Sequence, residues 1–310
     1  MNTTDKIAVC SRSFSRNLVL RSELMERYER VTFNDAGQQL DGDSLVDFLQ
    51  GHDKAITALE RIDESVLARL PDLKVIGKYG VGLDMIDMAS MRRHGKHLGW
   101  TGGVNRRSVS ELVISFAVAM LRNVPAAQRE VLTGTWRQHV GGLLSGRTVG
   151  IIGCGFIGKD LVELLQPWGC TLLVHDLLDF PDFYRRYNVM PMGLEDLLKR
   201  SDVVTLHIPM DDSTSNILDA RRLGLMKPSA ILINAARGGI VDEVALKSML
   251  IERRLAAAAF DVFAVEPPLD TELLNLPNFM VSPHIGGSAE EAILAMGRAA
   301  IDGLDTYAIP

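Results

Sequence analysis

The stretch that decides the fold is TVGIIGCGFIG, from Thr148 to Gly158. A short apolar run, Thr148–Ile152, leads directly into the pattern GxGxxG, and the helix-like segment Phe156–Leu165 leaves it. Glycines in this pattern permit a tight turn and let backbone N–H groups approach a pyrophosphate, while the helix N-terminus favours the anionic charge. The stretch therefore predicts a dinucleotide-binding site with a phosphate loop made of Gly153, Gly155, Phe156, Ile157 and Gly158.

A carboxylate follows at the interval that such a site requires. Asp176 comes after the next predicted strand, Thr171–Val174, and 18 residues after Gly158. A carboxylate at this place accepts a hydrogen bond from a ribose hydroxyl of NAD, whereas NADP sites offer an arginine to the 2′-phosphate. Because the three residues after Asp176 include no cation, we predict that the cofactor is NAD.

Short apolar strands alternate with helix-length segments throughout the chain, which is typical of βαβ units and a parallel sheet. In the second half the predicted strands are Thr148–Ile152, Thr171–Val174, Val203–His207, Ala230–Asn234, Ala257–Phe260 and Phe279–Ser282. In the first part they are Ile7–Cys10, Ala55–Ala58 and Leu73–Tyr79, with a helix at Leu18–Tyr28. Six strands with helices between them complete a doubly wound sheet.

We therefore predict an α/β protein with two doubly wound parallel-sheet domains, a Rossmann NAD-binding domain and a flavodoxin-like substrate domain, with a cleft between them. Ser288 and Glu291 form a capping box that predicts a final helix ending at about Tyr307. Because the second sheet is already complete, we expect this helix to pack on the first domain. The predicted substrate domain is residues 1–101 plus 288–310, and the predicted NAD-binding domain is residues 102–287.

A second capping box, Ser108 with Glu111, predicts the start of an unusually long helix. It opens the apolar segment Leu112–Leu121, and the helical pattern continues to about Val131. A glycine-rich passage from Gly134 to Gly146 then separates this helix from the dinucleotide motif.

The composition argues against several classes of protein. The net charge is −6, so nucleic-acid binding, which depends on Lys and Arg, has no support. No apolar run approaches the roughly 20 residues of a membrane span. The three cysteines lack CxxC spacing, and no Cys/His cluster has the spacing of metal ligands. We predict a cytoplasmic protein with no metal, no membrane contact and no secretory signal.

Three motifs place chemically useful side chains just past three predicted strands. Arg237 lies in NAARGG, Glu266 in DVFAVEP and His284 in SPHIGG. Parallel strands end at one edge of their sheet, where doubly wound folds bind ligands. The motifs therefore predict a cation, a carboxylate and an imidazole at a single edge.

At these residues the sequence resembles the D-isomer-specific 2-hydroxyacid dehydrogenase family, the group that contains phosphoglycerate dehydrogenase. The resemblance covers nearly the whole chain. It includes further motifs: Gly80-Val81-Gly82-Leu83-Asp84, Ser108-Val109-Ser110-Glu111, His207-Ile208-Pro209 and Leu225-Met226-Lys227-Pro228. The resemblance implies an NAD-dependent oxidoreductase that transfers hydride between nicotinamide and a D-2-hydroxyacid or 2-oxoacid.

The resemblance also implies that Arg237, Glu266 and His284 act together as the catalytic set. His284 is the candidate general acid/base, since imidazole titrates near neutral pH. Glu266 is expected to hold the ring and to favour its protonated form. Arg237 is expected to bind the substrate carboxylate through its guanidinium fork and to polarise the carbonyl.

Other motif residues take binding roles by the same resemblance. Asp261 is expected beside the nicotinamide, where it accepts from the carboxamide, and His207 and Pro209 form a loop along the cofactor. The loop Tyr79, Gly80, Val81 and Gly82 is expected to bind the substrate carboxylate, because glycines allow backbone N–H groups to form an anion-binding nest.

The cation Lys78 suggests that the substrate carries a second anionic group: a phosphate, phosphonate or carboxylate. Lys78 stands two residues before Gly80, where phosphoglycerate dehydrogenases have an arginine. Arg12 and Arg16, after the first strand, are further candidates, as are Arg106 and Arg107.

Two alternatives from other classes remain open. An NAD-sensing module like the C-terminal-binding corepressor uses the same fold, so the fold alone does not establish turnover. A phosphite-type dehydrogenase has a similar catalytic set. Formate dehydrogenases pair their histidine with glutamine, and the glutamate at position 266 argues against that branch.

The family dimerises through the region of the long helix, so we expect a homodimer. Trp136, Arg137 and His139 lie in the passage that reaches toward the partner's active site in relatives. No serine-binding regulatory domain is expected after the last helix.

Overall fold

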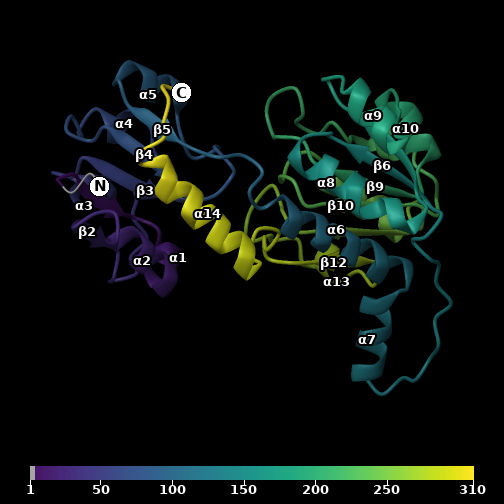
Figure 1. The fold of residues 1–310 in the computed structure, drawn as a ribbon. Coiled ribbons are helices and arrows are strands. Elements are labelled where there is room, and N and C mark those ends of the chain that lie inside the picture. The colour runs from purple at the N-terminus through teal and green to yellow at the C-terminus, as the bar shows by residue number, and fades with distance from the viewer. Residues whose placement is uncertain (1–3) are drawn as a thin grey trace. The chain divides into compact units, whose positions relative to one another are not determined.

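The computed structural model describes residues 4–310 and divides into two compact units. Unit 1 contains the described residues up to Asn105 together with Glu290–Pro310, and unit 2 contains Arg106–Ala289. Each unit is built on its own parallel sheet with helices packed against it (Figure 1). The prediction of an α/β protein with two parallel-sheet domains is confirmed.

Unit 1 has a five-stranded sheet with the order β2-β1-β3-β4-β5, the flavodoxin-like order. Its strands are β1 Lys6–Val9, β2 Arg30–Phe33, β3 Lys54–Thr57, β4 Val75–Lys78 and β5 His97–Gly99. Its helices are α1 Arg12–Arg16, α2 Leu18–Met25, α3 Gly42–Leu49, α4 Glu64–Leu67, α5 Met88–Arg93 and α14 Glu290–Gly303. The sequence pattern does not predict the two outer strands, β2 and β5.

Helix α14 closes this unit by packing its backbone against the sheet. A Cβ atom on Gly77 of β4 would lie 2.5 Å from the carbonyl oxygen of Ala300, and one on Gly99 of β5 only 1.9 Å from that of Gly303. Side chains at these positions would separate the helix from the strands. Figure 1 shows the C-terminal end of α14, in yellow, next to β4 and β5. The helix begins at Glu290 and ends at Gly303, four residues before the expected Tyr307.

Unit 2 has a seven-stranded sheet with the order β12-β11-β10-β9-β6-β7-β8. Its strands are β6 Thr148–Ile152, β7 Thr171–His175, β8 Met190–Pro191, β9 Val203–Leu206, β10 Ile231–Asn234, β11 Ala257–Phe260 and β12 Phe279–Val281. Its helices are α6 Arg106–Leu121, α7 Val124–Leu132, α8 Phe156–Leu165, η1 Gln166–Trp168, α9 Pro181–Tyr187, α10 Leu194–Arg200, α11 Ala220–Leu223, α12 Glu243–Ile251 and α13 Thr271–Asn275. The two-residue strand β8 extends the six predicted strands at one edge.

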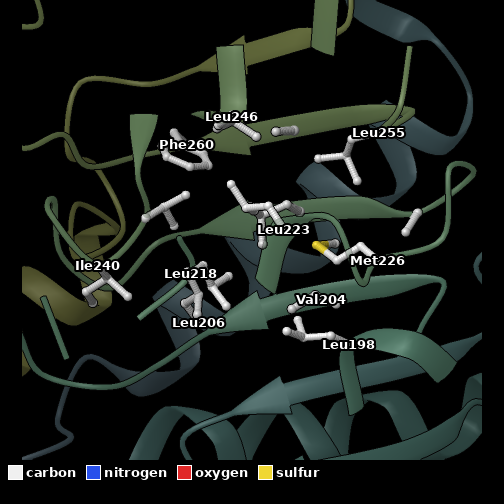
Figure 2. Close-up of a cluster of buried hydrophobic side chains, with 14 of the residues drawn as sticks. Leu198, Val204, Leu206, Leu218, Leu223, Met226, Ile240, Leu246, Leu255 and Phe260 are labelled. Carbon is white, nitrogen blue, oxygen red and sulfur yellow. The ribbon is translucent and has the colours of Figure 1, made fainter. Parts of the chain in front are cut away.

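Two apolar clusters make up the core of unit 2. One of them packs Leu206, Leu218, Ile240, Leu246 and Phe260 together, all fully buried (Figure 2). The buried strands β9, β10 and β11 pack against this cluster. This packing fixes the positions of the carboxyl ends of the three strands and of the loops that follow them.

The prediction of one long helix after Ser108 is wrong in two respects. Helix α6 begins at Arg106, so Ser108 is not its N-cap; its hydroxyl instead donates to the carbonyl oxygen of Gly286 at 2.6 Å. The helix breaks after Leu121, where Asn123 adopts a left-handed conformation with φ 54°, and α7 continues at an angle of 64°. Pro125 suits the first turn of a new helix, because proline lacks the N–H that a continuing helix needs.

Within residues 4–310 there is no single helix of the length and apolarity needed to cross a bilayer, although α6 and α7, taken as one bent pair, satisfy both criteria.

Candidate active site

The phosphate loop of unit 2 contains three glycines, and the protein itself excludes a side chain at only two of them. Gly153 has φ 100°, and its Cβ would lie 2.4 Å from the carbonyl oxygen of His207; a Cβ on Gly158 would lie 2.1 Å from that of Gly153. The chain itself therefore excludes side chains at both positions. Gly155 differs, because its φ is −75° and a Cβ there would meet nothing within 4 Å.

The open space at Gly155 is the observation that fits a bound dinucleotide. Gly155 is the N-cap of α8, where unpaired backbone N–H groups and the helix dipole favour an anion. Phe156 is exposed and Ile157 half-buried in the first turn of that helix. The loop fits the pyrophosphate of NAD, since backbone can approach a phosphate closely only where no side chain intervenes.

Asp176 is held beside this loop by two backbone amides. Its Oδ2 accepts from the N–H of Cys154 at 2.5 Å and its Oδ1 from that of Leu178 at 2.8 Å. A carboxylate has about four acceptor positions, so these bonds orient Asp176 and leave capacity for a ribose hydroxyl.

Burial raises the pKa of the Cys154 thiol to about 11, which keeps it protonated and unreactive.

The predicted catalytic residues follow three neighbouring strands, β10, β11 and β12. Glu266 Oε2 and His284 Nδ1 lie 2.9 Å apart, and Glu266 Oε1 accepts from the N–H of Phe263 at 3.0 Å. Glu266 therefore orients the imidazole through Nδ1, which leaves Nε2 as the ring atom available to a substrate. The His284 side chain is about half exposed, 51%.

The loop that carries His284 is fixed by Asp261. His284 has φ 54°, a left-handed conformation that costs a non-glycine residue of the order of 1–3 kcal/mol unless its surroundings impose it. The buried Asp261 carboxylate accepts from the N–H of Ile285 at 2.8 Å and of Gly286 at 2.7 Å, and from the hydroxyl of Ser282. The expected contact of Asp261 with the nicotinamide carboxamide stays a prediction.

Asn234, to which the sequence assigned no function, shapes the turn that carries Arg237. Its side-chain amide donates to the carbonyl oxygen of Arg237 at 2.9 Å and accepts from the N–H of Ala236 at 3.1 Å. The Arg237 guanidinium in turn donates to the carbonyl oxygen of Ala236 at 2.7 Å. Asn234 is buried at the end of β10, so only its position in the folded chain shows this role.

A second histidine near this edge, His207, differs in its electrostatics. Burial lowers the pKa of His207 to about 3, so its ring is neutral at physiological pH. Its Nε2 pairs with the hydroxyl of Thr205 at 3.0 Å, and within the described chain its buried Nδ1 has no hydrogen-bond partner. Pro209 lies two residues on, and its carbonyl oxygen accepts from the Thr214 hydroxyl at 2.8 Å. A neutral His207 does not donate a proton, which favours His284 as the acid.

The predicted substrate residues lie in unit 1, in and around the loop after β4. Gly80 has φ 119°, and the carbonyl oxygen of Val81 accepts from the Trp100 indole at 3.1 Å. Lys78 is buried, with its ammonium donating to the carbonyl oxygen of Ala58. The remaining predicted residues are Tyr79, buried with its ring perpendicular to that of Phe14, the half-buried Gly82, and the exposed Arg12 in α1.

Two of the other arginines considered for the substrate, Arg106 and Arg107, have a carboxylate partner of their own. Arg107 binds the buried carboxylate of Asp160 through two nitrogens, at 3.0 and 2.9 Å, and Arg106 lies 3.8 Å from the same group. Across residues 4–310, His, Cys, Asp and Glu side chains form no group of three or more suited to a metal ion.

The two sheets, the phosphate loop and the imidazole–carboxylate pair define the class of a two-domain α/β protein with a dinucleotide-binding site. The model of the D-isomer specific 2-hydroxyacid dehydrogenase NAD-binding domain matches residues 114–286. The chain belongs to the D-isomer-specific 2-hydroxyacid dehydrogenase family, and unit 2 carries the NAD-binding domain of that family. The resemblance inferred from the motifs and the prediction of NAD as cofactor are confirmed.

The relatives carry several names. D-3-phosphoglycerate dehydrogenase from Methanocaldococcus jannaschii is 37% identical over 245 residues, which cover 76% of this chain and 46% of that protein. Glyoxylate reductase from Thermococcus litoralis is 33% identical, covering 80% and 78%. A crystal structure of a protein from Thermus thermophilus is similar with a TM-score of 0.85 and 31% identity, covering 96% and 94%. The chain thus spans about half the length of the phosphoglycerate dehydrogenase that it matches.

Proposed function

We propose that the protein is an NAD-dependent D-2-hydroxyacid dehydrogenase, which interconverts a 2-oxoacid and a D-2-hydroxyacid. The observation that carries the proposal is the 2.9 Å contact between Glu266 and His284, in the unit that also holds the phosphate loop. The Arg237, Glu266 and His284 set fits an NAD-sensing binding module as well, so turnover of a 2-oxoacid is the property that separates the two classes.

The reaction needs a proton at the carbonyl oxygen as well as a hydride at the carbon. Bound NADH supplies the hydride. His284 delivers the proton from Nε2, and Glu266 at Nδ1 holds the ring in the orientation that this transfer needs. Arg237 binds the substrate carboxylate through two parallel hydrogen bonds from its guanidinium. Asn234 fixes the backbone of Arg237, and so the point from which its side chain extends. In the opposite direction His284 takes up the proton from the hydroxyl.

We infer that the substrate has a second anionic group. Support comes from the phosphoglycerate dehydrogenases among the relatives and from Lys78, whose ammonium lies 3.7 Å from the position of a Cβ on Gly80. The ammonium is thus next to the loop proposed to bind the substrate carboxylate. The glyoxylate reductase from Thermococcus litoralis is a relative whose name gives a substrate with one carboxylate, so the two classes must be compared directly.

NADH oxidation followed by absorbance tests both proposals. The panel is glyoxylate, pyruvate, oxaloacetate, phosphonopyruvate and phosphohydroxypyruvate, with NAD reduction by phosphite as a separate reaction. We expect turnover of 2-oxoacids, the highest kcat/KM for a dianion, and a loss of that preference in Lys78→Ala. No turnover of any 2-oxoacid contradicts the dehydrogenase, and a preference for pyruvate or glyoxylate contradicts the second anion.

We also propose a homodimer formed through α7 and the segment after it. Within unit 2, Figure 1 shows α7 and this segment extending away from the sheet. Large apolar side chains there are exposed, with Trp136 at 86% and Val140 at 96%. Exposed apolar surface of this kind marks an interaction site. Light scattering after size exclusion should give twice the chain mass, and a monomer at micromolar concentration contradicts the dimer.

A further inference from the structure

We propose that Glu243 is a positioning residue that holds the loop carrying Glu266, and that it acts on the reaction through the peptide between Phe263 and Ala264. Glu243 is the first residue of α12, and its Oε1 accepts from the N–H of Ala264 at 2.8 Å. This inference rests on the proposed dehydrogenase function, because Glu266 matters only if His284 transfers a proton.

The Phe263–Ala264 peptide is where two catalytic turns meet. One peptide earlier, the N–H of Phe263 donates to Oε1 of Glu266 at 3.0 Å, so the start of the loop and its glutamate are joined. On the other side, a Cβ on Gly238 would lie 1.9 Å from the carbonyl oxygen of Phe263 and 2.4 Å from the nitrogen of Ala264. The residue after Arg237 therefore packs directly on the peptide that Glu243 holds.

Glu243 accepts its hydrogen bond from the backbone N–H of Ala264 and is not paired with Lys247, the cation one turn along the same helix. Lys247, one turn further along α12, binds Asp270 at 2.8 Å and Glu272 at 3.0 Å. Burial raises the pKa of the half-buried Glu243 carboxyl, and the Ala264 N–H opposes that rise. A partly buried carboxylate on a backbone amide is suited to fixing a loop, because charged acceptors form the stronger hydrogen bonds.

The chain offers both a conservative variant and a matched control. Glu243→Ala removes the acceptor, whereas Glu243→Gln keeps an amide oxygen that can accept from Ala264. Asp242→Ala is the control: Asp242 caps the same helix, accepting from Val244 and Ala245 at 3.1 and 3.0 Å, and its loss weakens α12 without removing the contact to Ala264.

Two measurements on the full chain are needed: steady-state kinetics with NADH and the best 2-oxoacid, and hydrogen exchange of the segment around Ala264 without cofactor. We expect Glu243→Ala to lower kcat about tenfold or more, with KM and NADH affinity within about threefold, since a small misplacement of a catalytic group costs rate before binding. Exchange at Ala264 should accelerate in the same variant. Glu243→Gln and Asp242→Ala should stay close to the wild type in both readouts.

The proposal is overturned if Glu243→Ala keeps the wild-type kcat and exchange rate. It is equally overturned if Asp242→Ala loses kcat to the same extent, or if Glu243→Gln behaves like Glu243→Ala. A wild-type protein that turns over no 2-oxoacid refutes the dehydrogenase function instead, and the exchange measurement then still decides whether Glu243 holds Ala264.

Discussion

Replacing Gly155 with alanine separates the demands of a ligand from the demands of the fold. The new methyl group would meet no protein atom within 4 Å, and the backbone at φ −75° suits alanine. The main structural cost is that of alanine at an N-cap, under about 1 kcal/mol. For a unit of this size a cost below that limit lowers Tm by less than about 4 °C.

The cost to NADH binding should be larger. The methyl group enters the space over the N-terminus of α8 that the pyrophosphate needs, and overfilling such a space costs about 1–3 kcal/mol. That range raises the Kd for NADH about 5- to 150-fold. Fluorescence titration with NADH and thermal denaturation of the same samples measure the two effects.

Gly193 provides the matched control, because it is the N-cap of α10, has φ −64° and likewise has no protein atom within 4 Å of the position that a methyl group would take. Gly193→Ala should show the same small change in Tm and unchanged NADH affinity. Gly158→Ala should instead destabilise the fold, since its Cβ would lie 2.1 Å from a backbone oxygen. If Gly155→Ala binds NADH as tightly as Gly193→Ala, the account of the phosphate loop is refuted.

The other predictions concern the cofactor preference, the substrate fork and the core of unit 1. Asp176→Ala should lower the ratio of the NADPH Kd to the NADH Kd at least about fivefold, because the carboxylate of Asp176 repels the 2′-phosphate of NADPH. Parallel titrations with both cofactors measure this ratio, and an unchanged ratio contradicts the role of Asp176. Arg237→Lys should raise KM for the 2-oxoacid and should not restore wild-type kcat/KM, since the fork is lost; full activity in steady-state assays contradicts it. Lys54→Met should lower the free energy of unfolding in urea by about 1–3 kcal/mol, because Asp5 and Asp305 lose a buried cation 3.1 and 3.2 Å away. An unchanged urea midpoint would show that these two ion pairs do not stabilise the protein.

The buried part of the fold follows from the sequence, and the edges do not. Strands β6 and β11 are predicted at their observed bounds, since each is a short apolar run, almost wholly buried, between turn signals. Strand β2 alternates between exposed and half-buried residues, and β8 has only two residues, both exposed. Such edge strands leave no continuous apolar run, so periodicity does not reveal them.

The helix break at Asn123 escapes prediction for a related reason. The apolar pattern continues on both sides of it, and Pro125 is compatible with either a kink or a new first turn. Only the left-handed backbone of Asn123 decides between these possibilities.

The site shows the same division. The partnership of Glu266 and His284 is expected from the family resemblance, and the structure places the two side chains 2.9 Å apart. Asn234, Asp261 and Glu243 hold the turns around them by bonding to backbone groups. Such bonds depend on where the loops meet in space, and backbone acceptors and donors carry no residue-specific signal in a sequence.

The central claim is that His284, oriented by Glu266, transfers the proton in a reaction with NADH. The most direct test is the kcat of His284→Asn with the best 2-oxoacid, measured with the NADH Kd of the same protein. Asparagine is the suitable replacement, because it tolerates the left-handed backbone at φ 54°. The account predicts a kcat lower by about 10²–10⁴-fold with NADH affinity unchanged. A variant that binds NADH normally and keeps the wild-type kcat would contradict it.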